Sequence, residues 1–208
     1  MTTQLYLIRH GESTWNQAGR VQGWGDPALS ARGVAQAAAL ARRFRRQPLH
    51  RIYASPLKRA RQTARPVAEI AGLPVHPVAD LREVGLGRWE GRPVAHLRQR
   101  HAALYQTWLR TPSRAQIPGA EGIPVFRRRV IGAFRGILEE ADHGAMVALV
   151  THGGVIRVIL AHVLGIPFDP LMRGISLGNT SITRITRTRG QLAVTVLNDT
   201  THLMAGAR

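Results

Sequence analysis

The sequence predicts an α/β fold: a three-layer sandwich with a mostly parallel central sheet, helices on both faces and a small helical cap insertion. Short apolar stretches at residues 5–8, 51–54 and 146–150 have the length and composition of buried strands. Apolar residues at helical spacing follow these strands, and parallel strands need such crossover connections. Two of the strands run into a histidine and glycines, at the edge where open α/β sheets do their chemistry.

The first helix is expected to follow Ser30. A serine is a preferred N-cap, and the next residues place alanine, leucine and phenylalanine at helical spacing as far as Phe44. Arginines at positions 42, 43, 45 and 46 suit the negative end of the helix dipole. These features predict an amphipathic helix with one apolar face.

The second strand, residues 51–54, meets Ser55-Pro56. A capping serine followed by proline at the first helical position predicts a helix over about residues 56–71. Cations occupy the opening turns of this helix, where they oppose the helix dipole. This unfavourable position indicates a functional role for Arg59.

The middle of the chain has the composition of a cap. Residues 81–91 are glycine-rich and irregular. Two helices follow at about 94–110 and 124–140, and the segment between them is rich in proline, glycine and polar residues. We therefore expect a cap insertion at about residues 85–125.

The end of the chain predicts a β-hairpin. Residues 181–186 and 192–197 alternate apolar and polar side chains around Arg189-Gly190, which is a strand-turn-strand signal. This hairpin would add an edge strand to the sheet. Residues 75–78 predict one further short strand.

Composition narrows the class of protein. A chain of 208 residues suits one domain, here residues 1–208. It has no cysteine, which excludes disulfides, thiolate metal sites and cysteine nucleophiles. The net charge is +17, but the charge is spread and only Lys58 is a lysine, which argues against nucleic-acid binding. No stretch suits a signal peptide or membrane span, so we expect a cytoplasmic protein without a membrane partner; the oligomeric state stays open.

Five side chains have the chemistry that phosphate-ester cleavage needs without a metal ion. The reaction requires cations around the phosphoryl oxygens, a nucleophile in line with phosphorus and an acid for the leaving oxygen. The candidates are Arg9, His10, Arg59, Glu83 and His152. A two-metal site would need converging carboxylates, whereas the 12 Asp and Glu residues are scattered. We therefore expect no metal and no cofactor.

Five segments form an ordered set of motifs. They are Leu7-Ile8-Arg9-His10-Gly11-Glu12-Ser13-Thr14-Trp15-Asn16, Gln22-Gly23-Trp24, Ala54-Ser55-Pro56-Leu57-Lys58-Arg59-Ala60, Leu81-Arg82-Glu83 and Thr151-His152-Gly153-Gly154. In this order they resemble the histidine phosphatase superfamily, which contains cofactor-dependent phosphoglycerate mutases and many phosphatases. Any one segment is a weak signal, but the set spans residues 5–160 and is specific.

The resemblance implies a role for each catalytic candidate. His10 is the residue that becomes phosphorylated, and Glu83 gives a proton to the leaving oxygen. Arg9, Arg59 and His152 surround the phosphoryl oxygens. The chemistry of imidazole agrees, because a ring with one nitrogen donating to a backbone carbonyl presents its other lone pair to phosphorus.

Substrate-binding positions carry over from the same resemblance. The matching residues are Asn16, Gln22, Gly23 and Gly153. Asn16 is expected to donate directly to the phosphate, and Gly153 lets the backbone approach it closely. Aromatic residues near the expected cap, such as Trp108 and Phe126, either line an apolar wall or pack between helices. His202 follows the last strand and stays unassigned.

A phosphatase and a mutase of this family share the side chains around the phosphate. They differ in which molecule reacts with the phosphohistidine. Water gives hydrolysis, and a retained substrate hydroxyl gives isomerisation. The family's mutases are longer and differ after the acid residue, where this chain has residues 86–91, and after the second histidine, where it has Gly153-Gly154-Val155. We therefore expect a metal-independent phosphomonoester hydrolase for a small phosphorylated substrate. The alternatives are a cofactor-dependent phosphoglycerate mutase and a non-catalytic phosphate- or nucleic-acid-binding module.

Overall fold

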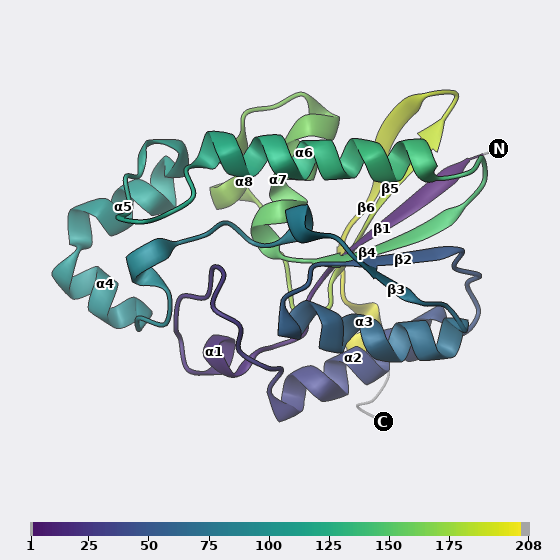
Figure 1. Cartoon of the computed structure of the whole chain (residues 1–208), viewed down its shortest axis with the longest axis horizontal. Coiled ribbons are helices and arrows are strands. Elements are labelled where there is room, and N and C mark those ends of the chain that lie inside the picture. The colour runs from purple at the N-terminus through teal and green to yellow at the C-terminus, as the bar shows by residue number, and fades with distance from the viewer. Residues whose placement is uncertain (1, 205–208) are drawn as a thin grey trace.

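The computed structural model of the chain describes residues 2–204 and has a twisted sheet at its centre (Figure 1). The sheet is six-stranded, in the order β3-β2-β4-β1-β5-β6. The strands are β1 (Thr3–Arg9), β2 (Arg51–Ala54), β3 (Val75–Pro77), β4 (Met146–Thr151), β5 (Ile182–Thr188) and β6 (Gln191–Asp199). Strands β1 to β4 are parallel and β5 and β6 pair antiparallel, which confirms the predicted mostly parallel sheet.

The predicted terminal hairpin is confirmed, and both of its strands join the sheet, where the sequence predicts that it adds one edge strand. Strand β5 pairs with β1, and β6 forms the edge. The turn between them has Arg189 at φ 51° and Gly190 at φ 82°, and positive φ at both positions matches the twist of a tight hairpin. The hairpin thereby places the residues just before β5 next to the end of β1.

Helices cover both faces of the sheet (Figure 1). One face carries α2 (Ala31–Phe44) and α3 (Lys58–Ala71), and the other carries α6 (Ile123–Glu140), α7 (Gly153–Leu164) and α8 (Phe168–Gly174). Along β1, Leu5 and Leu7 pack in the core under α6 and α7, whereas Tyr6 and Ile8 pack under α2 and α3. Both faces of β1 are covered, which agrees with its apolar run from Leu5 to Ile8, and the predicted three-layer sandwich is confirmed.

The predicted start of α3 is wrong. The helix begins at Lys58, later than the Ser55-Pro56 signal indicates. An aspartate from another loop supplies the cap, because the Lys58 N–H donates to the Asp26 carboxylate at 2.5 Å. Helix α2, by contrast, begins as predicted, with the Ser30 hydroxyl accepting from the Gly33 N–H at 3.0 Å.

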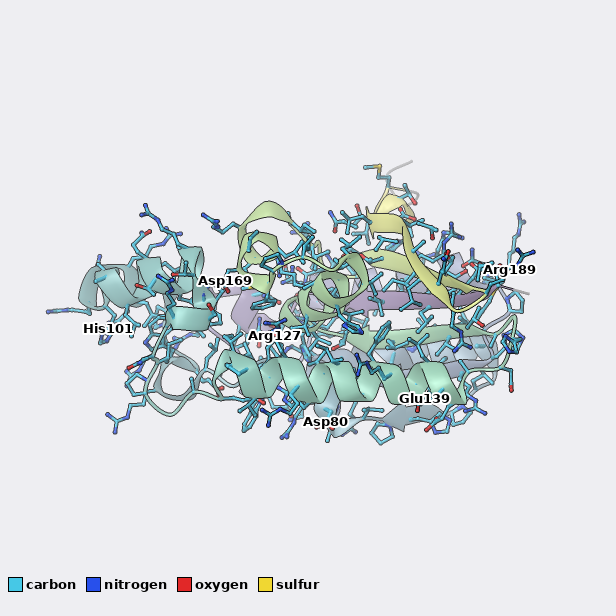
Figure 2. The ribbon with its side chains drawn as sticks, turned by 90° about the horizontal axis from the view of Figure 1, so that it is seen from above. Asp80, His101, Arg127, Glu139, Asp169 and Arg189 are labelled. Carbon is cyan, nitrogen blue, oxygen red and sulfur yellow. The ribbon has the colours of Figure 1, made fainter. Side chains whose placement is uncertain are left out.

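The single helix predicted at residues 94–110 is two helices. They are α4 (Val94–Arg100) and α5 (Ala102–Arg110), and His101 between them leaves the helical conformation with φ −132° and ψ 37°. Both helices extend beyond the carboxyl ends of the parallel strands (Figure 1), and His101 lies at the opposite end of the molecule from Arg189 (Figure 2). A cap function for residues 85–125, and a single domain over residues 1–208, stay predictions.

Two short helices are absent from the sequence prediction, namely α1 (Thr14–Gln17) and α8. Each is too short to show a helical period in the sequence. Single 3₁₀ turns occur at Ala79–Leu81, Gly87–Trp89, Pro112–Arg114 and Thr201–Leu203. Within residues 2–204, none of the helices has both the length and the apolar composition needed to cross a membrane.

Candidate active site

Two histidines meet because β1 pairs with β4. Arg9 pairs with Thr151 across these parallel strands, so the next residues, His10 and His152, leave the sheet side by side. The His10 N–H donates to the Thr151 carbonyl at 2.9 Å, and the two imidazole centroids lie 5.2 Å apart. Strand pairing alone thus joins residues that lie far apart in the sequence.

The His10 ring is held in one tautomer. Its Nδ1 lies 2.7 Å from the Gly11 carbonyl oxygen, which can only accept, so Nδ1 carries the proton and Nε2 keeps a lone pair. Burial, together with the charges of Arg59 and Arg9, lowers the pKa of His10 well below its ordinary value. The imidazole is therefore neutral, the form in which Nε2 is nucleophilic, at physiological pH.

His152 is fully buried and is held by a serine. Its Nε2 lies 2.8 Å from the Ser55 hydroxyl, which is the contact Ser55 makes in place of capping α3. Burial and the nearby Arg59 lower the pKa of His152 well below its ordinary value. Its Nδ1 is buried and has no hydrogen-bond partner within residues 2–204.

Arg59 is only 1% exposed although it lies in the first turn of α3. Its terminal nitrogens donate to the carbonyl oxygens of Gly25 at 2.7 Å and Gly23 at 2.8 Å. Burial lowers the pKa of Arg59 to about 10, so the guanidinium is still charged at neutral pH. Its Nε is buried without a partner among the described residues. A bound anion would offset both this unpaired donor and the unfavourable helix dipole.

Two more guanidinium groups lie beside Gly153. Arg9 donates to the Leu177 carbonyl, and Arg157 of α7 donates to the Ile175 carbonyl at 2.7 Å. A Cβ on Gly153 would lie 3.0 Å from Nη1 of Arg157 and 3.9 Å from Nε of Arg9. Burial lowers the pKa of both arginines. Sequence reasoning missed Arg157, but its position one helical turn after Gly153 could have shown that the two share a helix face.

Glu83 reaches the start of α7 from an irregular segment. Its Oε1 accepts from the Val84 N–H at 2.9 Å and its Oε2 from the Gly154 N–H at 3.0 Å. A Cβ at position 154 would lie 2.2 Å from Oε1 of Glu83, so a glycine is needed for this approach. The carboxylate is thereby fixed next to the helix that follows His152.

These groups enclose a cavity of about 300 Å³. The predicted site residues that line it are Arg9, His10, Gln22, Gly23, Arg59, Glu83 and Gly153. The rest of the wall is mostly apolar and includes Val21, Val84, Leu86, Trp108, Phe126, Phe168 and Met172. His152 does not line the cavity and lies in the layer beneath, against His10.

Asn16 is not among the lining residues. Its Oδ1 accepts from the Ser13 N–H at 3.1 Å and closes the capping box of α1. Gln22, which does line the cavity, accepts from the Ser13 hydroxyl at 2.9 Å. Direct contact between Asn16 and a phosphate therefore requires its side chain to turn from this cap.

The aromatic residues near the expected cap divide into two groups. Trp108 and Phe126 line the cavity. Trp89 and Tyr105 are buried and pack against each other, with ring centroids 6.1 Å apart. Ser113 donates to the Asp169 carboxylate at 2.5 Å and so ties the segment after α5 to α8, which supplies Phe168 and Met172 to the wall.

His202 supports the backbone behind the site. Its Nε2 lies 3.0 Å from the Thr180 hydroxyl, and the Thr180 N–H donates to the His10 carbonyl at 3.3 Å. Asn179 donates to the same carbonyl at 3.0 Å. His202 therefore touches the loop that holds His10 in place and does not line the cavity.

The charge of the cavity is positive, with the arginines Arg9, Arg59 and Arg157 against the single carboxylate of Glu83. Positive charges gathered in a partly apolar cleft attract an anion. Within residues 2–204, His, Asp and Glu side chains form no group of three or more that could hold a metal ion. The arrangement suits a phosphate dianion.

Acidification is expected to destabilise the protein through the two site histidines. Below pH about 6.5 the unfolded chain binds protons at His10 and His152, whereas the lowered pKa of each keeps the folded protein from doing so. Stability present above this pH is therefore lost as the pH falls, by about 3 kcal/mol between pH about 7.5 and 5.5. Urea denaturation at the two pH values measures this loss.

The exposed His143 provides the control for that experiment. His143→Gln should keep the full pH dependence, whereas His10→Gln should remove about half of it. Equal stability of the wild-type protein at both pH values would contradict the lowered pKa values of His10 and His152.

Residues 5–200 match the histidine phosphatase superfamily (branch 1). A Yersinia pestis (strain Pestoides F) protein named "Probable phosphoglycerate mutase GpmB" is 35% identical over 182 residues, which are 88% of this chain and 84% of that protein.

Solved structures agree over nearly the whole chain. The structure of Bacillus stearothermophilus YhfR has a TM-score of 0.91 at 32% identity and covers 97% of this chain and 99% of its own. A mycobacterial glucosyl-3-phosphoglycerate phosphatase has a TM-score of 0.85 at 28% identity, over 96% of this chain and 100% of its own. The family match over residues 5–200, together with these relatives, shows that the chain belongs to branch 1 of the histidine phosphatase superfamily.

Proposed function

We propose that this protein is a metal-independent phosphomonoester hydrolase that acts on small phosphorylated metabolites through a phosphohistidine at His10. The observation that carries the proposal is the meeting of a neutral His10, the arginines Arg9 and Arg59 and the acid Glu83 at one cavity of about 300 Å³. A nucleophile, an oxyanion clamp and an acid in one place are more than phosphate binding needs.

The first chemical step forms the phosphoenzyme. The lone pair on Nε2 of His10 attacks phosphorus while the bond to the ester oxygen breaks, and the leaving oxygen takes a proton from Glu83. Arg9 and Arg59 stabilise the charge on the phosphoryl oxygens with donors that are already in place. His152 lies beneath His10, and its Nδ1, which has no partner in the described structure, is the donor we assign to a phosphoryl oxygen that enters beside His10.

The second step returns the enzyme to its starting state. Water attacks the phosphoryl group, the phosphorus–nitrogen bond breaks and the Glu83 carboxylate accepts the proton of the water. Inorganic phosphate leaves, His10 is neutral again and Glu83 is protonated for the next cycle. The same carboxyl group thus acts as acid and then as base.

The walls of the cavity indicate the kind of leaving group. Trp108, Phe126 and Phe168 offer apolar surface, and the volume suits a small molecule. Arg157 adds a third guanidinium beside Arg9, which a second anionic group on the substrate could meet. The mycobacterial relative is named for glucosyl-3-phosphoglycerate, a small phosphorylated metabolite that carries a second anionic group.

The second candidate function is that of a phosphoglycerate mutase, which the name of the Yersinia pestis relative favours. A mutase keeps the first product in place so that another hydroxyl takes the phosphoryl group. The chain's departures from the mutase pattern after Glu83 and after His152 favour hydrolysis. The two reactions share the phosphohistidine and differ in product.

The test is a product assay with the purified protein in the presence of chelator. We expect inorganic phosphate from several phosphate monoesters, and a phosphorylated protein that maps to His10 after rapid base quenching. Isomerised phosphoglycerate without release of phosphate would establish the mutase instead. Phosphate binding with neither product nor phosphoenzyme would establish a binding module.

A further inference from the structure

Four consecutive backbone carbonyls, from Asp80 to the proposed acid Glu83 itself, are all bound by side chains. This segment leaves the 3₁₀ turn Ala79–Leu81 and has no regular structure as far as Glu83. The donors are Arg129 to Asp80 at 2.7 Å, Thr151 to Leu81 at 2.7 Å, Arg129 to Arg82 at 2.8 Å, and both Arg129 and Trp24 to Glu83 at 2.9 and 2.8 Å. Side-chain donors therefore hold the path of this segment where it leaves the 3₁₀ turn.

Arg129 uses its full set of donors here. A guanidinium has five N–H groups, and those of Arg129 make three bonds to carbonyls of the segment and two to Glu121, at 2.5 and 2.7 Å. Both side chains are largely buried, 12% and 8% exposed. Arg129 lies on α6, and Asp80 lies alongside this helix (Figure 2).

Glu121 holds the other side of the same segment. Its Oε2 lies 3.2 Å from the Gly85 N–H, and its own N–H donates to the Gly85 carbonyl at 3.0 Å. The ion pair of Glu121 and Arg129 thus forms hydrogen bonds with the backbone both before and after Glu83. Neither side chain lines the cavity, so neither is placed to touch a substrate.

We propose that Arg129, oriented by Glu121, is the positioning residue for Glu83 and sets the proton transfer to the leaving group. The inference rests on the proposed acid role of Glu83. The Glu83 carboxylate is anchored at Val84 and Gly154, and Arg129 fixes the carbonyl of the same residue. A displaced backbone at this point moves the carboxyl group away from the leaving oxygen, and proton transfer depends steeply on that distance.

The need for this proton depends on the leaving group. Benzyl phosphate releases an alkoxide, which is a poor leaving group unless it is protonated as it departs. The nitrophenolate of p-nitrophenyl phosphate is stable as an anion and leaves without an acid. Both compounds carry one aromatic ring for the apolar wall, so the ratio of their kcat/KM values reports on the acid and not on binding.

The test is Arg129→Lys, since lysine keeps the charge but has one nitrogen in place of the guanidinium fork. We expect kcat/KM to fall about 100-fold for benzyl phosphate and less than about 3-fold for p-nitrophenyl phosphate. Glu83→Gln provides the benchmark and should shift the ratio in the same direction by a larger factor.

A matched control tests whether any loss is merely structural. Arg187 also binds backbone carbonyls, those of Leu138 at 2.5 Å and Ala141 at 2.8 Å, but at the far end of α6. Arg187→Lys should leave the ratio of the two kcat/KM values unchanged even if it lowers the melting temperature. An equal loss on both substrates in Arg129→Lys would overturn the positioning role.

A milder variant keeps the proposal testable if Arg129→Lys does not fold. Glu121→Gln retains the shape and removes the charge that orients Arg129, so we expect a shift of about 5- to 10-fold in the same ratio. An unchanged ratio in this variant, with a shifted ratio in Glu83→Gln, would reject the role of Arg129 and leave the proposed function standing. An unchanged ratio in Glu83→Gln would reject the acid assignment itself.

Discussion

Replacing His10 with alanine is expected to lower kcat by about four orders of magnitude or more while the protein stays folded and still binds phosphate. The imidazole is the proposed nucleophile, because its Nδ1 is held 2.7 Å from the Gly11 carbonyl and its Nε2 keeps a lone pair on the cavity side of the sheet edge. Arg9 and Arg59, the proposed oxyanion donors, are untouched by the change. Steady-state kinetics and calorimetric titration with inorganic phosphate measure the two effects.

The same variant also tests the intermediate. No phosphoenzyme should form in His10→Ala under conditions that trap it in the wild-type protein. The Gly11 carbonyl loses its partner, at a cost of about 1–3 kcal/mol, so the melting temperature should drop modestly. Turnover within tenfold of the wild-type value would mean that another group attacks phosphorus.

Arg59→Lys is expected to lower kcat/KM by about 100- to 1000-fold. Lysine keeps the positive charge, but the guanidinium of Arg59 donates to the carbonyls of Gly23 and Gly25 and also has a buried Nε without a partner in the described structure. A single ammonium cannot bind two carbonyls and an oxyanion in these directions. The loop at Gly23, which lines the cavity, should therefore shift as well.

A neighbouring arginine gives the control for this substitution. Arg61 is exposed on the same helix, and Arg61→Lys should change kcat/KM by less than about twofold. Competition by inorganic phosphate measures phosphate binding, and kcat measures the chemical step. Arg59→Lys should weaken both. Full activity in Arg59→Lys would show that charge alone is sufficient and that the bidentate geometry is not used.

Much of the site could be predicted from local patterns. Apolar runs that end in Arg9-His10 and in Thr151-His152 indicate strand ends with polar groups at the sheet edge, and the observed strands end there. The start of α3 could not be predicted in this way. Ser55-Pro56 has the local signature of a cap, but the buried His152 binds the serine hydroxyl and Asp26 caps the helix.

Other functional contacts carry no local signature. Asn16 matches a substrate-binding motif, yet the short helix α1 holds its side chain in a capping box. Arg129 looks in the sequence like one of several surface arginines on an amphipathic helix. Its role depends on where α6 lies against the segment at residues 80–83, which is a matter of packing between distant parts of the chain.

The sequence by itself determined which chemical groups this protein has and which strands and helices carry them, because periodicity, caps and motifs act over a few neighbouring residues. Only the tertiary structure decided which of these groups meet. The pairing of β1 with β4 brings His10 to His152, and the packing of α6 brings Arg129 to the carbonyl of Glu83. Such meetings follow from strand register and helix packing across the whole chain, where a shift of a single residue would turn each side chain to another face.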